Sequence, residues 1–299
     1  MEGKQRTDYK KIKERLFNGI KYNPHPKQEL IHKSKARFRT LCSGRRFGKS
    51  TLASTEAVLA IMKADTRVWI VAPNYELTKK VFREVIIIMN KYLSKWILKQ
   101  SESMSYMKLI NGSELVGKSA DNPVSLLGEG LDLLIIDEAA SIKREVWEEY
   151  LRPTLADRQG SALFISTPKG KNWFYEEYVR GQDREIKEMH SWNFLTSDNP
   201  YIPKVEIVHA KKNLPERVFL QEFQGVFIED IGGVFRGVRD CVGGRLEDPD
   251  PNKSYVMGVD LAKYQDYTVI IVIEKVNKQV VYFDRFHKLD WNFQKNKIA

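Results

Sequence analysis

The chain has 299 residues, 42% hydrophobic and 11% aromatic, and this composition excludes a mainly disordered protein. The 49 lysines and arginines exceed the 39 aspartates and glutamates, and the net charge of +10 suits a polyanionic partner without requiring one. Two cysteines exclude a disulfide scaffold, and five scattered histidines give no zinc spacing. No apolar run approaches a membrane span, and the charged N-terminus lacks a signal core, so we expect a soluble protein of a reducing compartment.

An α/β pattern follows a basic arm at residues 1–20 and a proline-rich turn at 21–26. Short apolar runs typical of buried parallel strands occupy residues 38–42, 67–72, 133–137 and 162–166. Helices are predicted between and after them, at residues 49–62, 77–93, 144–151 and 173–181. A further strand is predicted at 187–194, followed by two short helices that open with proline, at 203–213 and 215–224.

A segment rich in glycine, aspartate and proline predicts a domain boundary, with a first domain at 1–230 and a linker at 231–253. Three strands are expected beyond it, at 254–262, 267–275 and 278–286. No covering helix is predicted for them, so we expect residues 254–299 to be poorly ordered or to pair with something else.

Residues 43–50 read SGRRFGKS and match the phosphate-loop pattern G-x-x-x-x-G-K-[ST], except that Ser43 replaces the first glycine. A predicted strand enters this loop and a predicted helix leaves it, as an anion site requires. The pattern assigns Lys49 to the β- and γ-phosphates, Ser50 to Mg²⁺ and Thr51 to the α-phosphate. The rest of the loop is expected to bind nucleotide as well: Ser43, Gly44, Arg45, Arg46, Phe47 and Gly48. The alternative is a basic turn that caps a helix.

The next motif is LDLLIIDEAA at 131–140, an apolar strand that ends in Asp137 and is followed by Glu138. A carboxylate at the end of a core strand is suited to hold Mg²⁺, and the next one is suited to deprotonate an attacking water. We therefore expect Asp137 to bind the metal and Glu138 to act as the base. Capping of a following helix is the alternative.

Three further sets of residues are candidates near the phosphates. The strand ALFIS ends in Ser166, Thr167 and Pro168, which are suited to sense hydrolysis at the γ-phosphate, unless this is an ordinary turn. Gln28 has an amide that reads both edges of adenine, unless it only starts a helix. Arg45 and Arg46 are candidates to neutralise transition-state charge in cis, and three arginines are candidates to do so from a neighbouring subunit: Arg144, Arg152 and Arg158.

Four segments in this order resemble the large subunit of tailed-bacteriophage terminases: SGRRFGKST (43–51), LLIIDEAA (133–140), FISTPKGKNWFYEEY (164–178) and RVFLQEFQGVFIEDIGGVF (217–235). The resemblance spans nearly the whole chain. It implies a P-loop ATPase core of the ASCE type, with a largely parallel sheet flanked by helices, followed by a ribonuclease H-like nuclease. It also implies a motor that uses ATP and Mg²⁺ to translocate double-stranded viral DNA into a procapsid.

The same resemblance implies partners and a location. The partners are double-stranded DNA, a small terminase subunit, the portal protein and further copies of the chain, which form a ring on the portal and are monomeric in solution. The location is the host cytoplasm, with transient docking on the procapsid. Related sequences often carry S-L-R-G before the second motif, with the arginine as trans finger, whereas this chain has Leu127 at that place.

GVDLAKYQDYTVIIV at 258–272 resembles the first strand of the nuclease, with Asp260 as a metal carboxylate and Asp266 as its helper for Mg²⁺ or Mn²⁺. Two-metal cleavage needs several carboxylates from separate strands, and no Asp-rich segment follows Asp290. We therefore expect a truncated nuclease domain at 254–299 that does not cut DNA. The alternative for Asp260 is a turn carboxylate in a plain hairpin.

Two other functions remain open. A superfamily 2-like helicase, or another DNA-dependent ATPase, predicts a second ATPase core, and the residues after ALFIS do not repeat the first one. A DNA-binding module without activity predicts no ATP turnover, which does not fit the paired Asp137 and Glu138.

Overall fold

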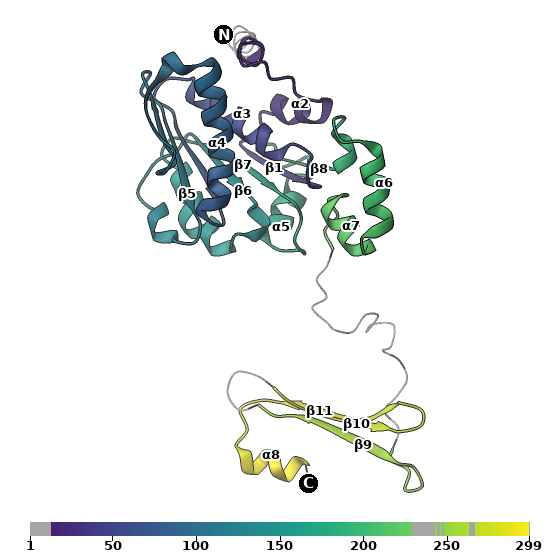
Figure 1. The fold of residues 1–299 in the computed structure, drawn as a ribbon. Helices are drawn as coiled ribbons and strands as arrows, with labels where there is room; N and C mark the ends of the chain where they lie inside the picture. Colours follow the sequence, from purple (N-terminus) through teal and green to yellow (C-terminus); the bar gives the residue numbers. More distant parts are fainter. Residues whose placement is uncertain (1–12, 229–242, 244–245, 247, 263–266, 299) are drawn as a thin grey trace. The chain divides into compact units, whose positions relative to one another are not determined.

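The computed structural model describes residues 13–228, 243, 246, 248–262 and 267–298. The chain divides into two compact units, Met1–Asp230 and Ile231–Ala299, and each is described by itself (Figure 1). Over the described residues, no helix combines the length and the apolar character needed to cross a membrane.

The first unit is built on a sheet of eight strands, which are, in spatial order, β3 (Ile97–Ser101), β4 (Tyr106–Leu109), β5 (Glu114–Ser119), β2 (Arg67–Ala72), β6 (Leu133–Asp137), β7 (Ser161–Ser166), β1 (Phe38–Ser43) and β8 (Met189–Phe194). Six strands that are adjacent in the sheet run parallel: β5, β2, β6, β7, β1 and β8. The strands β3, β4 and β5 pair antiparallel. The carboxyl ends of the parallel strands therefore meet at one edge, where ligands bind in open α/β sheets.

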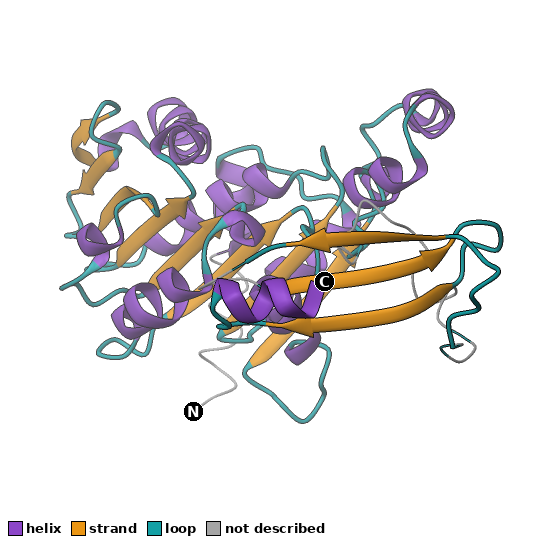
Figure 2. Cartoon of the chain, turned by 90° about the horizontal axis from the view of Figure 1, so that it is seen from below, coloured by secondary structure: helices purple, strands orange, loops and turns teal. Residues whose placement is uncertain are grey.

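Helices cover both faces of this sheet (Figure 2). The α-helices of the unit are α2 (Pro26–Lys33), α3 (Lys49–Ile61), α4 (Tyr75–Tyr92), α5 (Trp173–Arg180), α6 (Lys204–Asn213) and α7 (Glu216–Glu222). Short 3₁₀ segments lie between them, η1 (Ser94–Trp96), η2 (Pro123–Leu126), η3 (Ala139–Ser141), η5 (Arg152–Leu155) and η6 (Thr196–Asp198), together with a π-helical segment, η4 (Val146–Leu151).

Successive side chains along each strand point to opposite faces of the sheet and so belong to two separate hydrophobic cores. In β2, Val68 and Ile70 belong to the core under α3 and α4, whereas Trp69 and Val71 belong to the core on the other face, with η4 and α5. All four side chains are buried, which explains why such strands read as continuous apolar runs. The fold class is α/β with a largely parallel central sheet flanked by helices, as predicted.

A buried ionic cluster joins the N-terminal residues to the phosphate-loop helix. The carboxylate of Glu56 on α3 contacts Arg39 Nη2 at 2.7 Å, His32 Nδ1 at 2.6 Å and Lys13 Nζ at 3.2 Å. The Tyr22 hydroxyl contacts the other ring nitrogen of His32 at 3.0 Å. The three basic partners hold the pKa of Glu56 well below its usual range, although burial opposes them. Residues 13–19 are helical, so Lys13 fixes this helix to α3.

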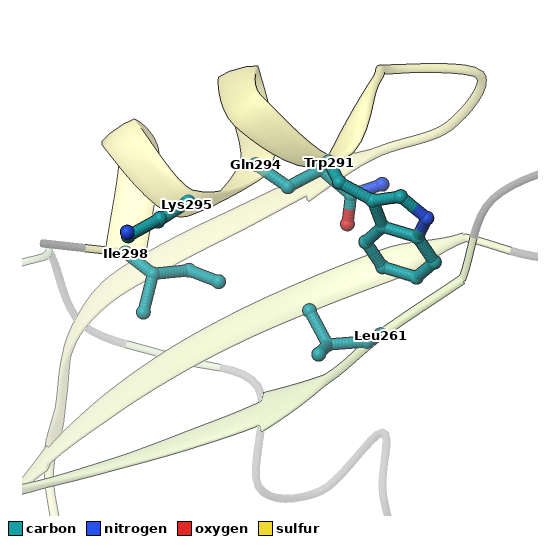
Figure 3. Close-up of a pocket in the computed structure, with 5 residues that line it drawn as sticks. All are labelled: Leu261, Trp291, Gln294, Lys295 and Ile298. Carbon is teal, nitrogen blue, oxygen red and sulfur yellow. The ribbon is translucent and has the colours of Figure 1, made fainter.

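The second unit holds an antiparallel sheet of β9 (Tyr255–Asp260), β10 (Thr268–Glu274) and β11 (Val280–Phe286), with β10 in the centre. Helix α8 (Trp291–Ile298) follows it. A cavity of about 310 Å³ lies beside α8 (Figure 3), and its lining is Leu261, Trp291, Gln294, Lys295 and Ile298.

Two sequence predictions differ from the structure, and three strands were not predicted. The expectation that no helix covers residues 254–299 is wrong, because α8 docks through Gln294, a polar residue that accepts from Thr268 Oγ1 at 2.8 Å and donates to the Ala262 carbonyl at 3.0 Å. The helix predicted at 144–151 takes a π-helical form over Val146–Leu151. The strands β3, β4 and β5 were not predicted, because they are short and carry many polar side chains.

Candidate nucleotide-binding site

The predicted phosphate loop connects β1 to α3 at the carboxyl edge of the sheet. Gly48 precedes α3 with a φ of +102°, a conformation that favours glycine, and a Cβ there would also displace the Gln28 amide, whose Nε2 lies 2.7 Å from its position. The first hydrogen bond inside the helix runs from Leu52 N to Gly48 O at 3.0 Å. The N–H groups of Lys49, Ser50 and Thr51 precede it, and such groups at a helix start form an anion site.

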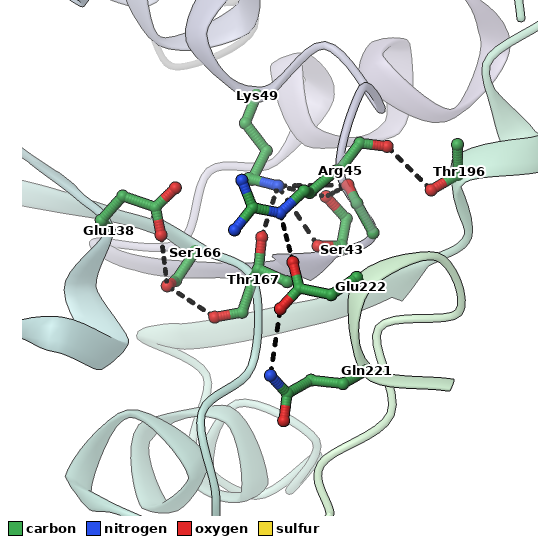
Figure 4. Close-up of polar contacts among 10 residues, drawn as sticks. Ser43, Arg45, Lys49, Glu138, Ser166, Thr167, Thr196, Gln221 and Glu222 are labelled. Atoms are coloured by element: carbon green, nitrogen blue, oxygen red, sulfur yellow. Dashed lines mark hydrogen bonds and ion pairs between the residues drawn. The ribbon is translucent and has the colours of Figure 1, made fainter. Parts of the chain in front are cut away.

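Lys49 is buried at the centre of this site. Its Nζ donates to the carbonyls of Ser43 at 3.2 Å and Gly44 at 3.1 Å, and to Thr167 Oγ1 at 3.3 Å (Figure 4). Burial lowers the pKa of Lys49, and the nearby carboxylates of Glu138 and Asp137 raise it in part. The loop therefore holds one cation over the end of β7, in the position suited to phosphate groups.

Asp137 ends β6 as predicted and is 7% exposed. Burial, followed by repulsion from Glu138, raises its pKa to about 7. Its Oδ1 accepts a hydrogen bond from the N–H of Glu138 at 3.0 Å. Burial and a neighbouring carboxylate disfavour the ionised form of Asp137. A divalent cation bound beside it would favour the ionised form, so the site suits such a cation.

Ser50 and Asp137 suit Mg²⁺ as a donor set. Mg²⁺ is commonly held by one or two protein oxygens together with phosphate oxygens and waters. No group of three His, Cys, Asp or Glu residues able to hold a metal occurs within the described part of the chain, which is consistent with this mode. The residues present therefore fit the ion that the sequence predicts.

Glu138 and the end of β7 form a second contact at this edge. Glu138 has a φ of +50°, and Ser166 Oγ donates to its Oε2 at 3.4 Å and to the carbonyl of Thr167 at 2.7 Å. Thr167 in turn contacts Lys49. Of the three predicted coupling residues, Ser166 ends β7 and contacts the base candidate, Thr167 follows it and contacts the phosphate-loop lysine, and Pro168 comes next (Figure 4).

Gln28 lies against the phosphate loop and is 5% exposed. Its Nε2 donates to the Gly48 carbonyl at 3.0 Å, and its Oε1 accepts from the N–H of His25 at 3.1 Å. His25 Nε2 also contacts the Phe47 carbonyl at 3.1 Å. One amide hydrogen and one lone pair of Gln28 remain outside these bonds. Contact with adenine stays a prediction.

The loop arginines have partners that the sequence analysis missed. Arg45 Nε donates to Glu222 Oε2 on α7, and Arg45 N donates to the Glu222 carbonyl at 2.7 Å. Thr196 Oγ1 donates to the Arg45 carbonyl and Asn199 Nδ2 to the Arg46 carbonyl, both at 2.7 Å. These residues lie about 150 or more positions from the loop, and only the motif RVFLQEFQGVF gave a signal for Glu222.

The candidates for a trans arginine are each engaged inside the chain. Arg144 pairs with Glu176 at 2.5 Å and Arg158 with Asp132 at 2.8 Å. Arg152 lies over the ring of Phe38, 5.0 Å from its centroid. Leu127, at the place of the usual finger, is 54% exposed.

Of the two carboxylates predicted for a nuclease site, Asp260 ends β9 and Asp266 lies outside the described residues. The register sets Asp260 opposite Val269, which is itself opposite Arg285. Asp284 is opposite Ile270, on the other face of the sheet, and its carboxylate pairs with Lys297 at 2.6 Å. Among the described strand residues, the direct cross-strand neighbour of Asp260 is therefore Val269, and the residue in line with it two strands away is the cation Arg285.

Comparison with known proteins assigns the chain to a family. Residues 41–239 match the family model described as the terminase large subunit, T4likevirus-type, N-terminal. The chain belongs to the terminase large subunit family. It is 32% identical to the terminase large subunit of Thermus virus P23-45 over 94% of this chain, and 32% identical to that of Escherichia phage T5 over 80% of this chain.

Solved terminase structures agree with the described fold. The ATPase domain of the large terminase of Thermus phage P74-26 is 32% identical, with a TM-score of 0.64 over 71% of this chain and 97% of that one. A large terminase from a thermophilic bacteriophage, solved with ADP, shares the fold at 14% identity, with a TM-score of 0.59 over 92% of this chain and 73% of that one. The chain spans 66% of the Thermus virus P23-45 terminase and 56% of the phage T5 one.

Proposed function

We propose that this terminase chain is an ATP-hydrolysing motor that translocates double-stranded viral DNA into a procapsid. The observation that carries the proposal is the contact of Lys49, in the phosphate loop, with Thr167, next to the strand end that contacts Glu138. The proposed phosphate-binding lysine and the proposed base therefore each contact one of two consecutive residues of the proposed coupling segment, Thr167 and Ser166. Family membership and the likeness to a solved terminase ATPase domain support the same activity.

In this mechanism, Lys49 and the N–H groups that open α3 bind the phosphates, and Glu138 takes the proton of the attacking water. Ser50 and Asp137 would hold Mg²⁺, which would neutralise charge on the phosphates. Ser166 Oγ lies 3.4 Å from Glu138 Oε2 and would orient this carboxylate when its hydroxyl turns toward it. Loss of the γ-phosphate changes the charge beside Lys49, and Thr167 carries this change into the segment that follows β7.

The proposed partners are double-stranded DNA, a small terminase subunit and the portal protein. The chain is proposed to act as a homo-oligomeric ring on the portal, to be monomeric in solution, and to work in the host cytoplasm while docked on the procapsid. A ring would supply a trans cation from a neighbouring copy, in addition to Arg45 and Arg46 in cis.

We further propose that residues 254–299 are the start of a ribonuclease H-like nuclease and that this chain does not cut DNA. The support is that no carboxylate joins Asp260 in a metal-holding group of three within the described residues. Plasmid digestion with Mn²⁺ or Mg²⁺ tests this, and cleavage that is lost in Asp260→Ala would contradict it.

The test of the motor function is an ATPase assay with Mg²⁺ and added partners. We expect turnover that a small terminase subunit or a portal stimulates and that Lys49→Ala abolishes. Stimulation by single-stranded nucleic acid instead would favour the helicase function, and absence of turnover under every condition would favour a DNA-binding module without activity.

A further inference from the structure

The side chain of Phe47 anchors the phosphate loop in the protein interior. Its ring is fully buried and stacks on the ring of Phe194 in β8, with centroids 5.2 Å apart and 14° between the ring planes. The ring of His25 meets it edge to face, with centroids 4.9 Å apart. Phe47 therefore offers a ligand only its backbone, and its side chain holds the loop against β8 and the residue that precedes α2.

His25 makes a hydrogen bond to the backbone of the same loop residue. It is 4% exposed, and its Nε2 lies 3.1 Å from the Phe47 carbonyl oxygen. A carbonyl oxygen can only accept, so Nε2 carries the hydrogen and donates it. The other ring nitrogen, Nδ1, is buried and has no hydrogen-bond partner among the described residues. The polar contact that the imidazole makes in this part of the chain is thus a contact with the phosphate loop.

A bond to the Phe47 carbonyl fixes the direction of the next N–H group. In a trans peptide the C=O and the N–H point to opposite sides of one plane, and the described residues contain no cis peptide. The Phe47 carbonyl faces His25, so the N–H of Gly48 faces away from it. Gln28 does the same one peptide later, because the Gly48 carbonyl accepts from its Nε2 at 3.0 Å and the N–H of Lys49 then faces away from Gln28. Successive N–H groups turned to one side form the kind of nest that binds phosphate.

We propose that His25 is a positioning residue for phosphate binding, which by donating to the Phe47 carbonyl turns the N–H of Gly48 toward the phosphates of a bound nucleotide. The role concerns the phosphates and not the base, because both ring nitrogens are enclosed, Nε2 by the loop carbonyl and Nδ1 by the surrounding protein. Ligands with the same phosphates and no base should therefore depend on His25 as well. This inference rests on the proposed nucleotide binding.

The experiment compares two substitutions of similar length and shape in the 299-residue chain. His25→Gln keeps an N–H donor within reach of the Phe47 carbonyl, whereas His25→Met removes the donor. The affinities of ADP and of inorganic triphosphate, both with Mg²⁺, are measured by competition with a fluorescent ADP analogue. We expect His25→Met to weaken both ligands by the same factor, about two- to tenfold, which is the range of one hydrogen bond. His25→Gln should bind both ligands within about twofold of the parent.

Two further variants separate the hydrogen bond from packing. His209→Met replaces an exposed histidine on α6 and should change neither affinity. His25→Asn keeps an amide that is too short to reach the Phe47 carbonyl, so it should weaken both ligands as His25→Met does. Thermal melting followed by circular dichroism, without ligand, shows which variants are folded. If His25→Met does not fold, the two amides His25→Gln and His25→Asn still test the inference.

Equal losses of affinity in His25→Gln and His25→Asn would overturn the inference, because reach to the carbonyl would then not matter. Unchanged affinities in His25→Met would overturn it too. A loss for ADP without a loss for triphosphate would also overturn it and would assign His25 to recognition of the base. If the unsubstituted chain binds neither ligand, the proposed function itself is wrong and this inference falls with it.

Discussion

Asp137→Asn should stabilise the nucleotide-free protein, even though Asp137 is a predicted metal ligand. In the folded protein its pKa is about 7, against 3.8 for an ordinary aspartate. A pKa raised by folding means that the unfolded chain ionises more easily, so the ionised group opposes folding at every pH above 3.8. The shift of about three units corresponds to about 4 kcal/mol once both states are ionised.

The sign of the pH dependence follows from the same pKa. At pH 8 the folded protein carries nearly the full penalty, so Asp137→Asn should gain about 4 kcal/mol in free energy of unfolding. As the pH falls through 7, Asp137 takes a proton in the folded state and the penalty shrinks. At pH 5 the advantage of the variant should be about 2 kcal/mol, and near pH 4 it should almost vanish.

Urea denaturation followed by tryptophan fluorescence measures this difference, in EDTA and without nucleotide. Five of the six tryptophans lie in the first unit, so the signal reports the unit that contains Asp137. Asp121→Asn is the matched control, because Asp121 is an exposed aspartate next to β5. A variant that is less stable than the parent, or an advantage that does not change between pH 8 and pH 5, would refute the reasoning.

Three other substitutions test separate parts of the structure. Lys49→Ala should lower nucleotide affinity at least tenfold in a calorimetric titration, because the buried cation between the phosphates is lost. Glu138→Gln should bind ATP as the parent does but hydrolyse it about 10²–10⁴-fold more slowly in a phosphate-release assay; unchanged turnover would show that another group is the base. Glu56→Gln should lower the free energy of unfolding by about 3–5 kcal/mol, because Arg39 loses its buried partner, whereas the exposed Glu29→Gln should cost less than 1 kcal/mol.

The parts of the fold that could be predicted from the sequence are the strands and helices that form continuous apolar runs. The strand before Ser43 and the helix after Gly48 were predicted because a buried parallel strand and a buried helix both read as apolar runs. Helix α8 was not predicted. It docks through the side chain of Gln294, and a polar contact of this kind leaves no apolar periodicity in the sequence.

The same distinction applies to the candidate site. Lys49, Asp137 and Glu138 belong to short motifs, and the type and order of the residues in these motifs predict their chemical roles. The contacts of Thr196 and Glu222 with Arg45 depend on chain segments far away in sequence, and nothing near Thr196 indicates that it meets the loop. Contacts between residues that are far apart in the sequence arise when the chain packs. They leave no recognisable pattern in the sequence around either residue.

The position of β1 between β7 and β8 has a consequence for how the protein folds. β1 ends at Ser43, but its two neighbours begin at Ser161 and Met189, so the strand that carries the phosphate loop is among the first to be synthesised and has no partner until much later. Closing such long loops is slow, because their entropy is lost before any contact is gained. A fragment that ends before Met189 would leave β1 with an open edge, which is prone to aggregation. Nucleotide binding therefore reports that the entire first unit has folded, and it is a practical measure of correctly folded protein during refolding or synthesis.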